Sequence, residues 1–179
     1  MRANIPGRAR AAIGALLLLA GSPALAAEEA ELDLFSVTRA RGALIRTDEN
    51  MSQFVGAAQG SVYVQTDEGP VRAGSVICSA SIDIDTASRA QKGSGLCTFT
   101  SDEGGEVYGK WTCSGFFLIG CSGPFSISGA SGRLKGAQGE GQINFRSAIA
   151  TLGGKPGEMA GAVEFEALVF WRNLKIRTP

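Results

Sequence analysis

The segment from Phe125 to Ile143 restricts the possible folds of this chain more than any other stretch. Phe125 and Ile127 alternate with Ser126 and Ser128, which is the period-2 pattern of a strand with one buried face. Glycines follow at places where a chain can turn tightly, bulge or bend. They are Gly129, Gly132, Gly136, Gly139 and Gly141. A strand, a tight turn and a glycine-interrupted return strand together predict a corner of a small β-barrel.

The same alternation recurs along the rest of the chain. It is clearest at residues 76–84 and 163–171, where every second residue is apolar, and Gly-rich turns such as 153–157 bound the strands. After the N-terminal segment no stretch shows a sustained helical period. We count about eight strands at short, even spacing. We therefore predict an all-β fold, a single closed antiparallel barrel, because closure removes exposed strand edges.

Some segments of this predicted barrel are less regular. Residues 27–33 form an acidic lead-in that we expect to be mobile or a short helical turn, and residues 172–179 resemble a polar tail. Val37 is expected to contribute to the core of the first strand. Phe54, Val62 and Val64 belong to one or two strands.

The N-terminus has the three parts of a secretory signal. Three arginines precede an apolar run from Ala11 to Ala20, and Ala24-Leu25-Ala26 places small residues at the spacing that signal peptidase requires. A membrane anchor is the weaker alternative, because the run is much shorter than the roughly 20 residues that span a bilayer. We expect a signal peptide over residues 1–26, one β-barrel domain over residues 27–179, and a periplasmic or secreted location.

The four cysteines are expected to form two disulfides, because the chain is predicted to be exported. If the chain reverses direction around residues 86–89, Cys78 falls opposite Cys97 on the same face of a hairpin. Cys113 and Cys121 bracket a short loop and would close it. The alternative bridge from Cys97 to Cys113 fits less well, because a turn at residues 102–105 leaves the two about three residues out of register. We predict Cys78–Cys97 and Cys113–Cys121.

Charge and composition exclude several function classes. Lys and Arg together number 17, as do Asp and Glu, and three of the arginines lie in the predicted signal, so the exported chain would be slightly acidic. Such a surface gives no electrostatic reason to bind nucleic acid. The chain has no His, which excludes Ser-His-Asp and Cys-His nucleophilic systems, and we expect no metal and no cofactor. The alternation is also too short and too rich in Ser and Gly for the lipid-facing band of an outer-membrane barrel.

A family resemblance lies in the turn that follows Phe125. Residues 128–139, with the sequence SGASGRLKGAQG, are similar to the motif Gly-Gly-Thr-Gly-Arg-Phe-x-Gly-x-x-Gly of the allene oxide cyclase barrel-like family. Residues 93–97, 102–106 and 111–121 also resemble the exported bacterial members of that family. The resemblance implies a lipocalin-like barrel related to the dirigent proteins.

The match departs from the motif at Ala130, Ser131 and Leu134, which stand where the family has Gly, Thr and an aromatic residue. The substrate-handling residues of the plant enzymes have no counterparts that we can place in this sequence. The resemblance therefore implies a fold, and it carries neither cyclase nor dirigent activity to this chain.

Carboxylates are the only acid–base candidates that this composition leaves. Asp102, Glu106 and, from the family motif, Arg133 are the weak catalytic candidates. A solvated hairpin tip is the plainer interpretation of the two carboxylates. For Arg133, hydrogen bonds to turn carbonyls or an ion pair with Glu140 are the plainer interpretation.

Four aromatic residues share the inward-facing parity of their predicted strands. They are Trp111, Phe125, Phe165 and Trp171. They form either a packed core or the lining of a cavity for one apolar ligand, since small barrels can hold such a ligand. The loop Phe116–Ile119 places four bulky apolar residues inside a disulfide loop. We expect this loop to plug a barrel end rather than to form a contact patch.

Two functions are therefore in view. The first is an exported non-catalytic β-barrel that binds a small lipophilic molecule or serves as an interaction module. The alternative is an isomerase or cyclase resembling allene oxide cyclase, which would act by holding its substrate in the barrel cavity and would need a carboxylate or an arginine beside it. The expected partner is a small apolar ligand. Nucleic acid and a transmembrane anchor are not expected, and oligomer formation is compatible with either function.

Overall fold

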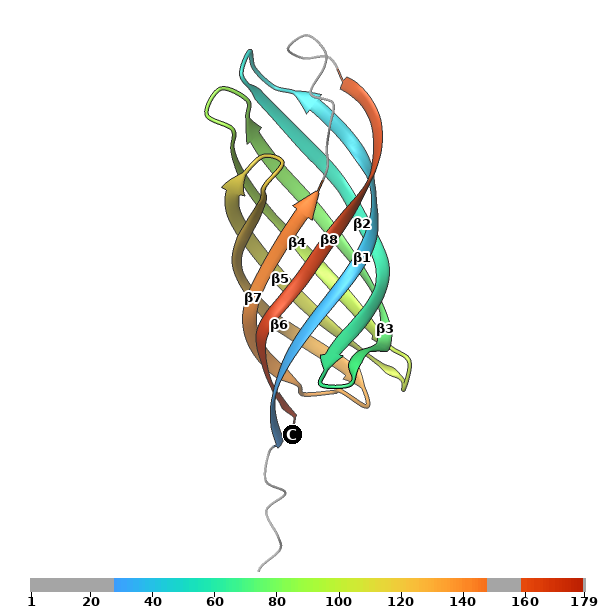
Figure 1. The fold of residues 1–179 in the computed structure, drawn as a ribbon. Coiled ribbons are helices and arrows are strands. Elements are labelled where there is room, and N and C mark those ends of the chain that lie inside the picture. Colours follow the sequence, from blue (N-terminus) through green and yellow to red (C-terminus); the bar gives the residue numbers. More distant parts are fainter. Residues whose placement is uncertain (1–27, 148–158, 179) are drawn as a thin grey trace, which may run out of the picture.

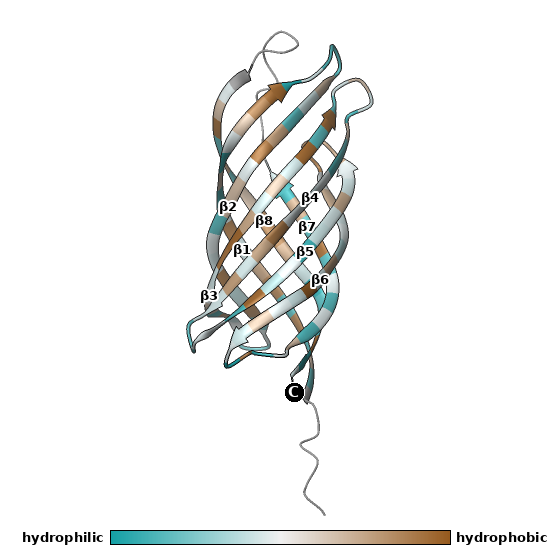
Figure 2. Cartoon of the chain, turned by 180° about the vertical axis from the view of Figure 1, so that it is seen from behind, coloured by the Kyte–Doolittle hydropathy of each residue, from teal (hydrophilic) through white to brown (hydrophobic). Residues whose placement is uncertain are grey.

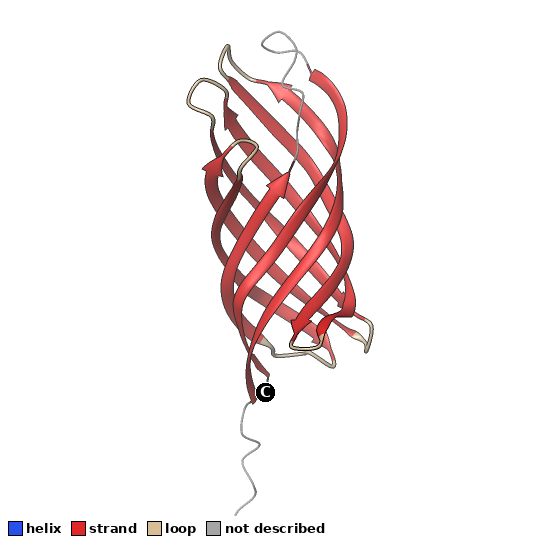
Figure 3. Ribbon diagram, viewed as in Figure 1, coloured by secondary structure: helices blue, strands red, loops and turns tan. Residues whose placement is uncertain are grey.

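The computed structural model describes residues 28–147 and 159–178, which form a closed barrel of eight antiparallel strands (Figures 1 and 3). Each strand pairs with its neighbours in the sequence, and the last strand returns to pair with the first. The strands are β1 (Glu28–Arg46), β2 (Met51–Thr66), β3 (Gly69–Asp85), β4 (Ala90–Ser101), β5 (Gly105–Phe116), β6 (Gly120–Gly132), β7 (Gln138–Ser147) and β8 (Met159–Thr178). The predicted fold class is confirmed.

The predicted signal peptide and the predicted turn at residues 153–157 lie outside the described residues. Over the two described ranges, no helix has the length and apolar character needed to cross a membrane.

The barrel has two distinct ends. We call the end at which β1 begins and β8 ends the proximal end, marked by the label C in Figure 1. The turns between β2 and β3, β4 and β5, and β6 and β7 also lie there. The turns between β1 and β2, β3 and β4, and β5 and β6 lie at the opposite, distal end.

Hydrophobic and hydrophilic residues alternate along much of the strands (Figure 2), and burial shows that this alternation separates the apolar interior from the outer surface. In β3 the buried residues Val76, Cys78, Ala80, Ile82 and Ile84 alternate with more exposed ones, as the sequence predicts. The apolar residues that face inward from all eight strands form one continuous core.

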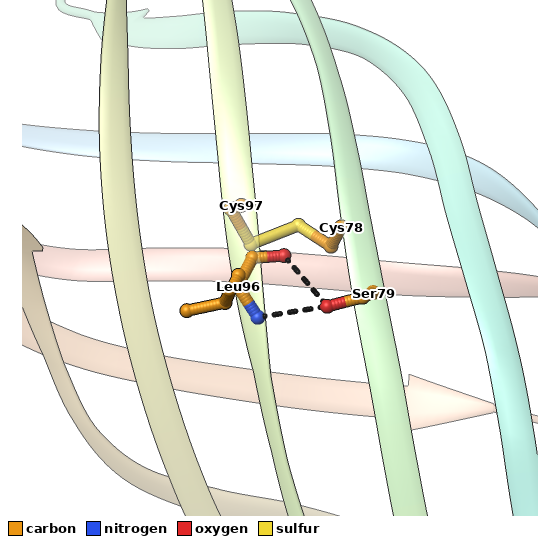
Figure 4. The surroundings of a disulfide bond; sticks show 4 residues. All are labelled: Cys78, Ser79, Leu96 and Cys97. Atoms are coloured by element: carbon orange, nitrogen blue, oxygen red, sulfur yellow. Dashed lines mark hydrogen bonds between the residues drawn. A yellow bond between two sulfur atoms is a disulfide. The ribbon is translucent and has the colours of Figure 1, made fainter.

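The two disulfides are those predicted. Cys78 and Cys97 stand directly opposite each other on β3 and β4, with their Cα atoms 4.0 Å apart, and Cys113–Cys121 joins β5 to β6. Next to the first bridge the Ser79 hydroxyl oxygen accepts a hydrogen bond from the Leu96 amide at 3.1 Å and donates one to the Leu96 carbonyl at 3.4 Å (Figure 4). The hydroxyl thus joins β3 to β4 where the regular strand pairing is interrupted.

Glycines make room for the large rings inside the barrel. A Cβ atom at Gly42 or Gly56 would overlap the ring of Phe54, and one at Gly109 would overlap the ring of Phe125. These glycines therefore have a steric role, because a ring packed against a neighbouring strand needs a position there without a side chain.

Val37 was predicted to lie in the core, and this is wrong. Its side chain is 53% exposed on the outer surface, while Ser36 and Thr38 are buried. The Ser36 hydroxyl donates to the Ser61 carbonyl at 2.7 Å and the Thr38 hydroxyl donates to the Ala167 carbonyl at 3.1 Å. Hydroxyls that find backbone acceptors can be buried at little cost, so hydrophobicity alone does not set the inward face of β1.

Only one residue of the loop Phe116–Ile119 plugs the end of the barrel as predicted. Phe117 packs against the barrel core, and its amide donates to the Arg89 carbonyl at 2.8 Å. Phe116, Leu118 and Ile119 are exposed. Residues 117–119 form a turn in which Leu118 has a positive φ of 67°, so the loop does not continue the alternation of the strands.

Replacing Gly109 tests the steric role of the glycines. We expect Gly109→Ala to lower the free energy of unfolding by about 1–3 kcal/mol, because the added methyl group must displace the buried Phe125 ring. Gly129→Ala on the neighbouring strand is the matched control, since its Cβ atom would make only an ordinary contact with Tyr108. Urea unfolding followed by circular dichroism measures both. Equal stability of the two variants would contradict the interpretation.

The turn after β3 gives the barrel a component of stability that depends on pH. Asp85 accepts hydrogen bonds from the Ser88 hydroxyl at 2.6 Å, from the Ser88 amide at 3.1 Å and from the Ala87 amide at 2.9 Å. Those from Ser88 are the main reason that the pKa of Asp85 lies below its ordinary value of 3.8. The folded state therefore favours the ionised carboxylate. This stabilisation is complete above the ordinary pKa and is lost as the pH falls through the folded value.

We expect Asp85→Asn to reduce stability at neutral pH and to flatten its decline in acid, because the variant has no carboxylate to protonate. Denaturant midpoints measured from neutral pH down to acid test this. Asp67→Asn, at an exposed turn, is the control that should keep the slope of the parent protein. An unchanged slope in Asp85→Asn would show that this turn does not contribute.

Candidate functional site

The proximal end of the barrel contains an apolar cavity of about 200 Å³ that opens to solvent. Every strand except β7 contributes to its wall, within the described part of the chain. The residues that line it are Leu32, Leu34, Val62, Val64, Ala73, Gly74, Ser75, Phe99, Thr100, Ser101, Val107, Phe125, Ile127, Leu134, Leu174 and Ile176. Few polar side chains are among them, so the cavity suits an apolar occupant.

Three aromatic rings separate this cavity from the filled part of the barrel. The centroids of Phe99 and Trp171 lie 4.9 Å apart, those of Phe99 and Phe125 5.9 Å, and those of Phe125 and Trp171 6.4 Å. All three pairs meet edge to face, which is a favourable geometry for aromatic rings. Phe99 and Phe125 line the cavity, and Trp171 is completely buried behind them. These rings form the aromatic floor of the cavity.

A bulge in β8 supplies part of the cavity wall. The residues of β1 pair with β8 as Leu34↔Trp171 and then Leu32↔Leu174, so one extra residue is accommodated on β8. Asn173 has a positive φ of 49°, and its amide donates to Asp33 Oδ1 at 2.8 Å. Asn tolerates this left-handed conformation better than most residues. The extra residue shifts the parity of the strand, so Leu174 faces inward as Trp171 does.

Two sequence predictions for this end are therefore wrong. Residues 172–179 were expected to be a polar tail, but β8 continues to Thr178 with Leu174 and Ile176 on the cavity wall. Residues 27–33 were expected to be mobile or helical, but β1 begins at Glu28 and pairs with the end of β8. The sequence alone does not show the alternation in these two segments, because it depends on the bulge and on pairing with a distant strand.

The four aromatic cavity candidates occupy different positions. Phe125 lines the cavity, and Trp171 contacts two rings of its floor. Trp111 and Phe165 do not line it. Trp111 is buried beside Gly93 and Gly95, and Phe165 packs against Phe54 at a centroid distance of 5.3 Å. A role for any of the four in contacting a ligand stays a prediction.

Both tryptophans carry an unused hydrogen-bond donor. The indole Nε1 atoms of Trp111 and Trp171 are buried and have no partner among the described residues. A buried donor without a partner costs about 1–3 kcal/mol, so these rings are held by the packing of their apolar surfaces.

None of the three catalytic candidates lines the cavity, although each is next in the sequence to a residue that does. Asp102 is exposed and forms an ion pair with Arg72, with Nη1 and Oδ2 2.9 Å apart. Glu106 accepts a hydrogen bond from the Tyr108 hydroxyl at 2.6 Å. Arg133 is exposed and has no partner in the described ranges, so its predicted bonds to turn carbonyls or to Glu140 are not formed. The structure thus brings none of the three together with the apolar site.

Sequence reasoning missed several wall residues. Phe99 and Val62 were placed on strands but not assigned to a cavity, although the period-2 pattern contains the signal. Leu134 lies in the turn between β6 and β7 at the position where the family motif has an aromatic residue, and it too lines the cavity.

Comparisons with known proteins assign no family to the chain. No family model matches the chain, and no curated protein matches it in sequence. A solved structure of a pterocarpan synthase dirigent protein is similar to 88% of this chain and 99% of its own, at 14% sequence identity and a TM-score of 0.35.

Proposed function

We propose that this protein is a non-catalytic β-barrel that binds a small apolar molecule in its proximal cavity. The observation that supports this most is the cavity itself, which has about 200 Å³ of space, an apolar wall and an opening to solvent. An apolar cavity of about 150 Å³ can hold a benzene molecule. The proximal cavity therefore suits one or two aromatic rings or a short alkyl chain.

The contrast between the two ends of the barrel supports a binding function over a purely structural one. Toward the distal end, Phe54, Phe165, Trp111 and the Cys113–Cys121 bridge fill the interior. The strands of the same barrel surround the proximal end, but there no side chain of the described residues fills the space inside the apolar wall. Each methylene group that a ligand buried there would contribute about 0.8 kcal/mol, which is a sufficient driving force for binding.

Catalysis of the allene oxide cyclase type has less support. It would need a carboxylate or an arginine beside the cavity, and Asp102, Glu106 and Arg133 do not line it. We do not assign an isomerase activity to the barrel.

We infer a distant relationship to the allene oxide cyclase barrel-like family from residues 128–139. In support, Gly132 and Gly136 of this segment adopt positive φ values of 61° and 88°, which the motif's glycines are suited to provide. Gly141, just beyond the motif, lies at a register shift between β7 and β8.

We propose that the protein is exported and loses residues 1–26. Its two disulfides suggest an oxidising environment, which agrees with the signal-like composition of the N-terminus. We expect N-terminal sequencing of the protein from the periplasm or the medium to begin at Ala27, and thiol labelling of that material to find no free cysteine. Recovery of chains that still contain residues 1–26 would contradict the proposal.

Calorimetric titration with 2-naphthol tests the binding function. The parent protein should bind this neutral two-ring compound. Val64→Phe should weaken binding by about tenfold, because the larger ring occupies the cavity that Val64 lines. Val55→Phe is the matched control on the outer face of the same strand and should change the affinity by less than about twofold.

Two results would count against ligand binding in this cavity. The first is a lack of measurable binding by the parent protein. The second is an equal loss of affinity in Val64→Phe and Val55→Phe, since that would place the 2-naphthol elsewhere.

A further inference from the structure

The strands β6 and β7 separate toward the proximal end. Their pairing ends at Ser126↔Glu140, yet β6 continues to Gly132 beside β5, and β7 already begins at Gln138 beside β8. The turn between them crosses the proximal end of the barrel (Figure 1). A wedge-shaped gap in the strand pairing results. We call the space between residues 127–130 and residues 135–139 the β6–β7 wedge.

The wedge contains a groove on the outside of the barrel. Its volume is about 760 Å³, and residues 126–130 and 135–140 form most of its lining. Over residues 127–130, β6 has no strand partner on its β7 side. Backbone groups of such an edge are free to bond to a ligand.

Ile127 separates this groove from the apolar cavity, because it lines both. Its side chain packs against the barrel core. Its Cδ1 atom approaches Gly139 on β7, so closely that a Cβ atom at Gly139 would lie 3.1 Å from it. Ile127 therefore lies where paired backbone would otherwise close the wall, and the buried Ala137 lines the same groove.

The groove carries an excess of positive charge. Lys135, Lys175 and Arg177 line it, with Glu29 and Glu140 as the opposing charges. Arg177 and Glu29 already form an ion pair, with Nη2 and Oε2 3.4 Å apart. The ammonium groups of Lys135 and Lys175 have no ion-pair partner in the described part of the chain. Two carboxylates oppose an anion here, because Glu140 on β7 and Glu31 on β1 both stand across from Lys175 in the strand register.

We propose that the β6–β7 wedge is the second compartment of the binding site and holds a negatively charged group of the ligand. The apolar body of the ligand fills the proximal cavity, and Ile127 is the partition that the ligand displaces as it enters from the side. The ligand class is a small aromatic or alkyl body with one carboxylate, sulfate or phosphate group. This inference rests on the proposed function, because it requires the cavity to hold the apolar body.

Probes that share one body and differ in charge test the wedge. The neutral 2-naphthol is compared by calorimetry with 2-naphthoate, 2-naphthyl sulfate and 2-naphthyl phosphate, which distinguish the three anions. Neutralising both lysines, by Lys135→Gln with Lys175→Gln, should weaken the preferred anionic probe by about fivefold, the size expected for two exposed charges. The same change should leave 2-naphthol within about twofold, and added salt should weaken only the anionic probe. The exposed Lys92→Gln on β4 is the control.

The role of Ile127 has a separate readout. Ile127→Ala removes most of the partition and should raise the association rate of the anionic probe by roughly threefold or more in stopped-flow measurements. Ile77→Ala is the matched control, because Ile77 is exposed on the outer face of β3. Equal rates in the two variants would overturn the side entrance.

The outcomes separate the two proposals. Binding of 2-naphthol with no effect of the lysine substitutions on any anionic probe would overturn the wedge as an anion compartment and leave the proposed function standing. Failure of every probe to bind the parent protein would overturn the proposed function and this inference with it. Loss of anionic binding in Lys92→Gln to the same extent would also overturn the wedge, because the effect would then be one of overall charge.

Discussion

The pairing of β8 with β1 is the interaction on which the rest of this structure depends. It runs from Glu28↔Thr178 to Ile45↔Met159 and turns an open sheet into a barrel without free edges. Once closed, the barrel has a fixed inside, and every strand must place side chains there that fit the space left by the others. The large rings of Phe54 and Phe125 fit because glycines lie beside them. Closing the barrel thus limits the volume of the side chains that can point inward.

Closure also explains why the two ends of the barrel differ. The disulfides cross-link β3 to β4 and β5 to β6, and each contributes on the order of 2–4 kcal/mol by restricting the unfolded chain. The proximal end is shaped by the β8 bulge and by the separation of β6 from β7. A bulge bends its strand and leaves residues unpaired, so these irregularities create space where regular pairing would bring the walls together. The aromatic floor keeps that space from collapsing into the core.

The sequence reveals features that depend on local alternation, and it conceals those that depend on distant partners. Strand positions, the closed architecture and both disulfides follow from period-2 patterns and from register across short hairpins. The inward position of Leu174 does not, because it requires Asn173 to bond to Asp33 on a strand near the other end of the chain. Val37 was misplaced for a similar reason, since hydrophobicity carries no information about the backbone acceptors of Ser36 and Thr38. Most of the fold was predictable, but the cavity wall was predictable only in part.

The segment that most restricts the fold is also the segment that opens the barrel wall. Residues 128–139 must turn the chain, and their glycines permit that turn. The same turn is longer than the paired hairpin requires, because pairing has already ended at Ser126. A tighter hairpin would have closed the wall and left the cavity with a single apolar opening. The longer turn instead places an apolar volume and a positively charged groove on the two sides of Ile127. In the binding function that we propose, two such compartments would select ligands by shape through one and by charge through the other, without a catalytic group.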